Sequence, residues 1–248
     1  MRMGLRSVAG RASRIVCSSR PEQRELAELV HPVVADRLMV VRNGIDLPRP
    51  PDPLVRPEVR AELGVAPDEV AALYLGELGS HKDPLTAVRA AVDVRRRGTR
   101  FVLLVAGAGD LMPQIERHAG PALRILGFRR DAERLMAAAD IFTMPSRREA
   151  HSFALIEAMA HRLPAVVSNG VGNPQTVGAA GVVAPAGSVS AFSDALAALA
   201  SNPEERERLG RLARRRVARE FARPRMLEQM GKVFEEALER RPVSLPAG

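Results

Sequence analysis

Two glutamates and one lysine stand where charged side chains can bind an anionic, hydroxyl-rich ligand. Lys82 closes the segment Gly-Glu-Leu-Gly-Ser-His-Lys at 76–82, and Glu149 and Glu157 are separated by seven residues in a later segment. Small residues allow backbone N–H groups to approach a phosphate closely, and lysine adds a compact positive charge. Carboxylates accept hydrogen bonds from hydroxyls. The combination indicates a ligand that carries hydroxyls on both sides of a phosphate.

The elements that would position the two glutamates can be predicted from the segment 141–167. The apolar runs 141–144 and 165–167 predict two buried parallel strands. Ser152 suits a helix N-cap, residues 153–161 are rich in strong helix formers, and Pro164 cannot continue a helix. The start of a helix at the carboxyl edge of a parallel sheet binds anions, most often phosphate. A nucleotide sugar fits such a site.

Glu157 is predicted to lie on a mostly apolar helical stripe. With about 100° per residue, its stripe neighbours are Phe153, Ala154, Ala160 and His161. A glutamate in such surroundings needs a partner, and a bound ligand is one candidate. The structural alternative is an ordinary strand–helix–strand unit with an acidic residue on its surface.

The whole segment resembles the signature of retaining nucleotide-sugar glycosyltransferases with two facing Rossmann domains. This group comprises the group 1, family 4-like transferases of the GT-B fold. The residues that carry the resemblance are Pro145-Ser146, Glu149, Glu157-Ala158-Met159-Ala160 and Leu163-Pro164-Ala165-Val166-Val167. The resemblance implies transfer of a hexose from a nucleoside diphosphate sugar to an acceptor hydroxyl, with retention at the anomeric carbon. It implies neither a cofactor nor a metal ion.

The resemblance also implies roles for individual residues. Lys82 and the backbone N–H groups of Ser152 and Phe153 would neutralise the leaving diphosphate. Glu149 would orient the sugar hydroxyls, and Glu157 would accept hydrogen bonds from the ribose. Lys82 and Glu149 are the predicted catalytic residues. The further donor-binding residues that the resemblance implies are Gly79, Ser80, Phe128, Arg129 and His151.

Several of these residues also have purely structural interpretations. Lys82 suits a surface position at a helix start, Phe128 suits a core position, and His151 suits either a bond to donor hydroxyls or a cap. The segment Gly-Ala-Gly-Asp at 107–110 suggests a dinucleotide fingerprint, but Met112 stands at its third glycine position. A tight strand-to-helix turn explains these glycines better, which argues against a nicotinamide-dependent enzyme.

The chain departs from the family pattern at three positions. Glu77 stands where the family often has arginine, Gln175 where it usually has glutamate, and Arg162 where it normally has glycine. A left-handed arginine at the helix end would cost about 1 kcal/mol or more, so the helix either accepts this strain or ends differently. The first two departures favour an alternative function, a non-catalytic or truncated donor-binding module that needs a separate acceptor domain.

The composition and charge of the chain limit the classes of molecule that it is expected to bind. The chain has 248 residues, one cysteine, a net charge of +8 and only two lysines, Lys82 and Lys232. The arginine clusters at 95–97 and 206–225 suit solvated helix faces, or attraction to anionic lipid or an anionic acceptor. One tyrosine, no tryptophan and no nucleic-acid motif argue against a nucleic-acid partner. We expect a cytoplasmic protein, with peripheral contact at the inner membrane surface left open, and an acceptor that is lipid-linked, a polysaccharide or of another kind.

From residue 69 onward, apolar runs alternate regularly with amphipathic segments, which predicts an α/β fold with a doubly wound parallel sheet. The predicted strands are 70–75, 101–106, 123–126, 141–144, 165–168 and 181–183. The predicted helices are 84–97, 111–118, 131–138, 152–161 and 173–177, followed by a helical last third.

The domain organisation follows from this alternation and from the resemblance. Residues 1–45 are predicted to be a remnant of the acceptor-side domain, because the family usually has a far longer first domain. The predicted elements are a helix, a strand at 14–18, a helix at 21–30 and a strand at 38–41. Residues 46–57 form a proline-rich linker, 58–222 the nucleotide-sugar-binding Rossmann-like domain, and 223–248 a C-terminal crossing helix and tail. Met226, Met230, Phe234 and Leu238 form an apolar stripe on that helix.

Overall fold

The computed structural model describes residues 12–49 and 52–239, which fall into two compact units. Unit 1 contains the described residues up to Asp46 together with those from Glu220 onward, and unit 2 contains Leu47–Arg219. The predicted helix before residue 14 and the prolines Pro50 and Pro51 of the predicted linker lie outside the described residues. The structure therefore gives no account of these three features.

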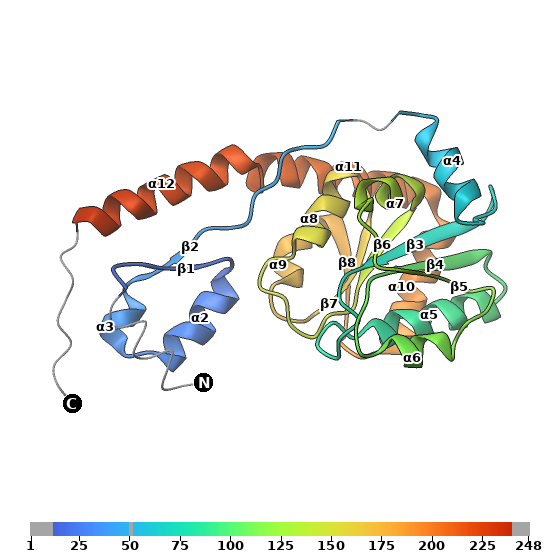
Figure 1. The fold of residues 1–248 in the computed structure, drawn as a ribbon, viewed down its shortest axis with the longest axis horizontal. Coiled ribbons are helices and arrows are strands. Elements are labelled where there is room, and N and C mark those ends of the chain that lie inside the picture. Colours follow the sequence, from blue (N-terminus) through green and yellow to red (C-terminus); the bar gives the residue numbers. More distant parts are fainter. Residues whose placement is uncertain (1–11, 50–51, 240–248) are drawn as a thin grey trace. The chain divides into compact units, whose positions relative to one another are not determined.

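Unit 2 is built on a six-stranded parallel sheet with the order β5-β4-β3-β6-β7-β8 (Figure 1). The chain starts in the middle with β3, adds β4 and β5 on one side, and then adds β6, β7 and β8 on the other. This is the predicted doubly wound arrangement. All strands are parallel, and the side on which the chain adds new strands changes between β3 and β6. The strands are β3 (Val70–Leu75), β4 (Phe101–Ala106), β5 (Leu123–Gly127), β6 (Ile141–Met144), β7 (Ala165–Ser168) and β8 (Gly181–Ala184).

Helices cover both faces of this sheet, which explains why its central strands are apolar along their whole length. The helices α5 and α10 pack against each other on one face, whereas α7 and α8 pack on the other and α4 packs against α7 (Figure 1). The helices of unit 2 are α4 (Val55–Glu62), α5 (Pro84–Arg96), α6 (Met112–Glu116), α7 (Ala132–Ala138), α8 (Phe153–Ala160), α9 (Asn173–Val177), α10 (Val189–Ser201) and α11 (Pro203–Glu220).

Helix α8 ends on a left-handed arginine. Arg162 has φ 61°, its N–H donates to the carbonyl of Met159, and the N–H of Leu163 donates to that of Ala158. These two bonds form a Schellman motif, in which glycine is usual at the left-handed position. The helix thus ends in the same way as a glycine-terminated one and accepts the backbone strain. Close packing accompanies this ending, since a Cβ added to Gly210 of α11 would lie 2.1 Å from the Arg162 carbonyl oxygen.

Arginines of α11 bind the carboxyl ends of three other helices. Arg206 donates to the carbonyls of Leu199 and Ala200 at the end of α10, at 2.6 and 2.9 Å. Arg214 donates to Ala160 at the end of α8 at 2.6 Å, and Arg216 donates to Thr176 in α9 at 2.8 Å. Cations stabilise the negative ends of helix dipoles. Part of the basic cluster at 206–225 is therefore structural.

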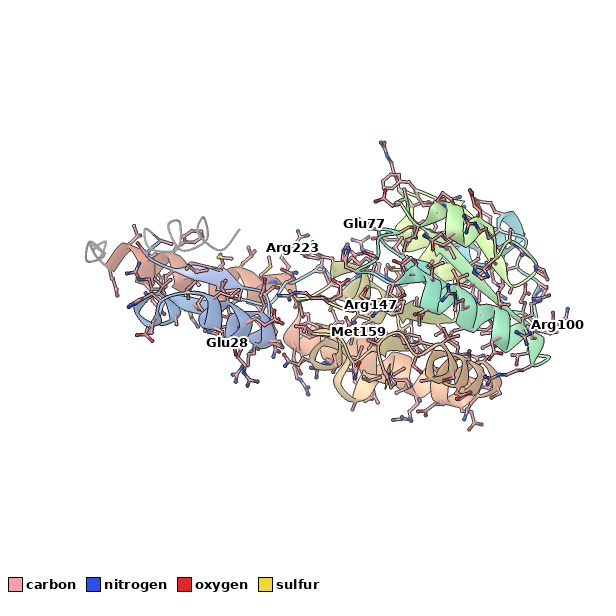
Figure 2. All side chains as sticks on the ribbon, turned by 90° about the horizontal axis from the view of Figure 1, so that it is seen from below. Glu28, Glu77, Arg100, Arg147, Met159 and Arg223 are labelled. Carbon is pink, nitrogen blue, oxygen red and sulfur yellow. The ribbon has the colours of Figure 1, made fainter. Side chains whose placement is uncertain are left out.

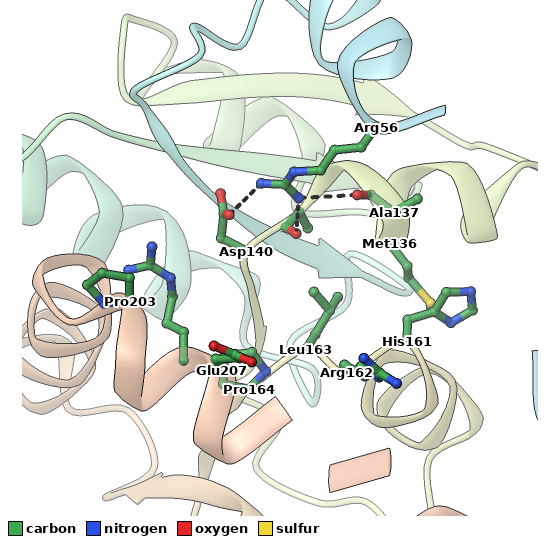
Figure 3. A pocket seen from close by; sticks show the side chains of 12 residues that line it. Arg56, Met136, Ala137, Asp140, His161, Arg162, Leu163, Pro164, Pro203 and Glu207 are labelled. Carbon is green, nitrogen blue, oxygen red and sulfur yellow. Dashed lines mark hydrogen bonds and ion pairs between the residues drawn. The ribbon is translucent and has the colours of Figure 1, made fainter. Parts of the chain in front are cut away.

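A second set of cations stabilises the amino edge of the sheet. Arg56 and Arg60 of α4 both bind the Asp140 carboxylate, at 2.6 and 3.1 Å, and both donate to carbonyls at the end of α7. Asp140 also accepts from the backbone N–H of Ala71 at 2.8 Å. Figure 3 shows Arg56 and Asp140 beside a pocket at this edge, which His161 and Glu207 also line. The contacts explain how α4 is fixed on α7.

Unit 1 contains a small parallel sheet and the last helix. The strands β1 (Ile15–Cys17) and β2 (Leu38–Val40) pair in parallel, and α2 (Arg20–Leu29) and α3 (Pro32–Ala35) connect them. The helix α12 (Arg223–Glu239) contacts this part through an ion pair of 2.6 Å between Arg14 and Glu236. On the predicted apolar stripe, Phe234 is 64% exposed and Leu238 is 88% exposed. No helix within residues 12–49 and 52–239 is both long and apolar enough to cross a membrane.

Candidate functional site

The predicted site residues gather at the carboxyl edge of the sheet in unit 2. The loop 76–83 follows β3 and the loop 145–152 follows β6, and these two strands are neighbours at the point where the strand order reverses. In open α/β sheets, ligands bind at this point because the two loops diverge to opposite faces. In Figure 2, Glu77 and Arg147 mark the two loops, and Arg100, before the amino end of β4, lies at the opposite end of the unit.

Lys82 and Glu149 form an ion pair that joins these loops. The Lys82 Nζ donates to Oε1 of Glu149, and the Ser146 hydroxyl donates to the same oxygen at 3.0 Å. The Glu149 side chain is only 10% exposed and that of Lys82 is 24% exposed. Burial makes an unpaired charge costly, so each group depends on its partner. Lys82 does lie just before a helix, α5, and the structure adds to the surface interpretation an ion pair with Glu149.

Further bonds between the same loops surround this pair. Arg147 binds Asp83 at 3.1 Å, and its backbone N–H donates to the carbonyl of His81 at 2.9 Å. Asp83 has φ 49°, a left-handed conformation that aspartate tolerates better than most residues. The two loops are therefore held as one platform by two ion pairs and a backbone bond.

Gly79 lies close to two side chains of its own loop, those of Glu77 and His81. A Cβ added to Gly79 would lie 3.0 Å from the Glu77 carboxylate and 3.3 Å from the His81 ring, and these two groups are 3.7 Å apart. Glu77 and His81 are both largely exposed, as is Ser80. Burial, and after it the carboxylates of Glu149, Glu77 and Asp83, raise the pKa of Tyr74. The loop 76–83 therefore has acidic as well as basic surroundings.

The start of α8 lies beside this platform. Ser152 is the N-cap, as predicted, and its hydroxyl accepts from the Leu155 N–H at 3.5 Å, which is a weak bond. Phe153, the first helical residue, is 50% exposed, whereas His151 is buried. The first N–H groups of α8 are the groups that an anion would bind.

Glu157 lies one turn into α8 and is half-buried. Burial raises the pKa of its carboxyl, the charge of His161 lowers it, and that of Glu133 raises it, with burial the largest effect. Among the described residues, no side chain or backbone group forms a hydrogen bond or ion pair with this carboxylate. The half-buried carboxylate is therefore open to a ligand or to water.

A cavity of about 360 Å³ opens at the same edge, where β3, β4 and β5 end. Glu77, Phe128, Arg129 and Ala154 line it with their side chains, together with residues of the strand ends. Phe128 is 71% exposed, so the core interpretation of this residue is wrong. Arg129 binds Asp131 through two bonds of 2.7 and 2.6 Å. Among the described residues, Lys82, Glu149 and Glu157 do not belong to this lining.

The glycines at 107–110 have a structural explanation. Gly107 has φ 155°, and a Cβ there would lie 1.8 Å from the carbonyl oxygen of Gly76. The loop after β4 therefore needs glycine because its backbone touches the loop after β3. The turn interpretation explains this segment without a bound dinucleotide.

Sequence reasoning missed the contacts that support Glu149. In the sequence, Ser146 stands out only as part of the family signature, yet its hydroxyl contacts the carboxylate. Asp83 and Arg147 were not singled out at all, although they form the second ion pair of the platform. Each partner belongs to a loop whose conformation is not periodic, so spacing gave no signal. Within residues 12–49 and 52–239, no group of three or more His, Cys, Asp or Glu side chains is arranged to hold a metal ion.

Comparison with known proteins identifies relatives of unit 2 and of most of the chain. The family model described as glycosyl transferases group 1 matches residues 69–202, just over half of the chain. The D-inositol 3-phosphate glycosyltransferase of Nocardia farcinica is 32% identical over 235 residues, which are 87% of this chain and 50% of that protein. The alpha-maltose-1-phosphate synthase of Mycobacterium tuberculosis is 28% identical and covers 84% of this chain and 59% of its own length.

Solved structures share the fold. The Anabaena HepE structure in complex with UDP-glucose has a TM-score of 0.86 at 18% identity, covering 94% of this chain and 68% of that chain. The sucrose-phosphate synthase of Thermosynechococcus elongatus has a TM-score of 0.80 at 21% identity, covering 96% and 61%. This chain spans about half the length of the curated relatives that it matches first.

Proposed function

The chain belongs to the group 1 glycosyl transferases, and from this premise we propose that it binds a nucleoside diphosphate sugar and transfers its hexose to an acceptor hydroxyl with retention. The observation that carries the proposal is the ion pair of Lys82 with Glu149 beside the start of α8. It combines a cation, backbone N–H donors and a carboxylate at the reversal point of the sheet. An anionic group with neighbouring hydroxyls is the ligand that this combination fits.

In this proposal the two charged groups exchange partners when the donor binds. Lys82 turns from Glu149 to the diphosphate and, with the N–H groups of Ser152 and Phe153, stabilises the charge that develops on the leaving group. Glu149 accepts hydrogen bonds from the sugar hydroxyls and so fixes the sugar relative to its acceptor. As the bond to the diphosphate breaks and the new glycosidic bond forms, the proton of the acceptor hydroxyl passes to the departing diphosphate oxygen.

The nucleoside is proposed to lie between Glu157 and the cavity lined by Phe128 and Arg129. Glu157 supplies a half-buried carboxylate to which no described group bonds, which suits the ribose hydroxyls. Phe128 offers an exposed ring for stacking against a base. Gly79, Ser80 and His151 complete the proposed contacts around the phosphates and the sugar. The base, the sugar and the acceptor stay open, including a lipid-linked or polysaccharide acceptor.

A second candidate function is a donor-binding module that acts with a separate acceptor domain. It is favoured by two departures from the family pattern, Glu77 and Gln175. Glu77 puts a carboxylate in loop 76–83 where the family often has an arginine, and an arginine would help to stabilise a leaving diphosphate. Both candidates share the donor site, and they differ in whether this chain completes the transfer.

One experiment tests both candidates. The full chain is incubated with radiolabelled UDP- and GDP-sugars, and binding, donor hydrolysis and transfer to added acceptors are measured separately. Binding with turnover is expected from the transferase, and binding without hydrolysis or transfer supports the module. No binding of any nucleotide sugar would overturn the proposed donor site.

A further inference from the structure

Ser146 lies directly behind the carboxylate of Glu149. It follows β6, is 1% exposed, and its hydroxyl donates to Oε1 of Glu149 at 3.0 Å. Lys82 binds that same oxygen. Within the part of the chain that the structure describes, no bond reaches the other oxygen, Oε2. The two donors therefore hold the carboxylate by one oxygen and leave the other as a free acceptor.

The backbone of Ser146 is itself fixed from the next strand. The Ser168 hydroxyl, at the end of β7, donates to the carbonyl of Ser146. The Asn173 side-chain amide donates to that hydroxyl at 3.1 Å, and the Gly170 N–H does so at 3.3 Å. Ser168 and Asn173 are almost completely buried. Buried hydrogen bonds of this kind have few alternative partners, so they give Ser146 one position.

The backbone of Glu149 is fixed by the same loop. Its N–H donates to the carbonyl of Val171 at 3.0 Å. Gly172 has φ 89°, and a Cβ there would lie 2.0 Å from the Glu149 carbonyl oxygen. With the backbone held in this way, rotation about the side-chain bonds is the main freedom left to Glu149, and among the described residues its carboxylate forms hydrogen bonds to Ser146 and Lys82 alone.

We infer that Ser146 is a positioning residue that aims Oε2 of Glu149 at the hydroxyls of the bound sugar. The inference rests on the proposed function, in which Lys82 moves to the diphosphate. Ser146 then remains as the protein donor on Oε1. A carboxylate held before the ligand arrives loses less conformational freedom on binding, so the ligand binds more tightly.

The test compares ligands with and without the sugar. Ser146→Ala removes the hydroxyl, Ser146→Thr restores it, and Ser193→Ala serves as the matched control. Ser193 is also fully buried, but its hydroxyl bonds to the Ala90 carbonyl in α5 at 3.4 Å. Calorimetry first tests the unchanged full chain with two ligand pairs, UDP with UDP-glucose and GDP with GDP-mannose. The affinities of the variants are then measured with the pair that the unchanged protein binds.

We expect Ser146→Ala to weaken binding of the nucleotide sugar by up to about tenfold, because the ligand must then order the Glu149 side chain itself. Binding of the nucleoside diphosphate is expected to change less than about twofold, since it lacks the sugar that Glu149 would contact. The threonine variant should recover most of the sugar affinity, and Ser193→Ala should change neither ligand. If the alanine variant does not fold, Ser146→Cys gives the same comparison, because a thiol is a weak donor of similar size.

Two results would overturn the inference and leave the proposed function intact: an unchanged affinity for the nucleotide sugar, or equal losses for the sugar and the diphosphate. Equal losses would mean that Ser146 only stabilises the loop. If the unchanged protein binds none of the four ligands, the proposed donor site is wrong for both UDP- and GDP-sugars, and the inference about Ser146 fails with it.

Discussion

Lys82 and Glu149 are 67 residues apart in the sequence, and their side chains form an ion pair at the edge where β3 and β6 are neighbours. Neither residue belongs to the strand or helix next to it, so only the order of the strands brings them together. The pair neutralises two charges that would otherwise be buried alone. It also places a cation and a carboxylate side by side where, in the proposed function, one would bind the diphosphate and the other the sugar hydroxyls.

Replacing Lys82 by alanine is expected to lower the affinity for the nucleotide sugar roughly 10–100-fold, because charge-assisted hydrogen bonds contribute about 1.5–3 kcal/mol. Isothermal calorimetry at constant salt measures the change. The chain offers a matched control in Lys232→Ala, since Lys232 is its only other lysine and forms an exposed ion pair with Glu228. Equal losses for both variants would contradict a specific role for Lys82.

Glu157→Gln is expected to stabilise the folded protein at pH 7 and to do so less at pH 4. Burial raises the folded-state pKa of Glu157 above its ordinary value of 4.5. The ionised carboxylate therefore destabilises the fold above the folded-state pKa, and this penalty disappears as the pH falls below 4.5. Urea unfolding of both proteins at the two pH values measures the difference. The same variant should bind the nucleotide sugar more weakly, and a pH-independent gain in stability would contradict the titration of Glu157.

Glu77→Arg is expected to strengthen binding of a nucleoside diphosphate several-fold at low salt, because it exchanges a repulsive charge in loop 76–83, the proposed diphosphate-binding loop, for an attractive one. The gain should shrink as ionic strength rises, since this side chain is exposed. Titration at two salt concentrations measures it. Glu116→Arg in α6 makes the same charge change elsewhere in unit 2, and an equal gain there would show that only net charge matters.

Arg162→Gly is expected to raise the free energy of unfolding by about 0.5–1 kcal/mol. Glycine removes the left-handed strain at φ 61°, and its greater freedom in the unfolded chain offsets part of that gain. Denaturant unfolding monitored by circular dichroism measures the effect. Arg211→Gly, in the interior of α11, should instead destabilise by about 1 kcal/mol. A destabilised Arg162→Gly protein would mean that contacts of the arginine side chain outweigh the strain.

The amino-acid sequence by itself determined where most strands and helices of unit 2 lie and that they form an α/β fold. The strands Val70–Leu75, Phe101–Ala106, Ile141–Met144 and Ala165–Ser168 lie where the apolar runs predicted them, and α9 lies where a short helical turn is expected near 173–177. Each of these signals is local, because a buried strand must be apolar along its length and a helix needs its caps close by. The family signature is also local, since it spans one strand–loop–helix–strand segment, and the family model supports it.

Only the tertiary structure decided which charged groups meet. The Lys82–Glu149 pair, the Asp83–Arg147 pair and the Ser146 hydroxyl on Glu149 join loops that depend on the order of the strands. The left-handed Arg162 was an open alternative in the sequence, and packing against Gly210 accompanies the ending that the structure shows. The physical reason is the same throughout: periodic elements are specified by neighbours along the chain, whereas ion pairs and buried hydroxyl contacts depend on segments that folding alone brings together.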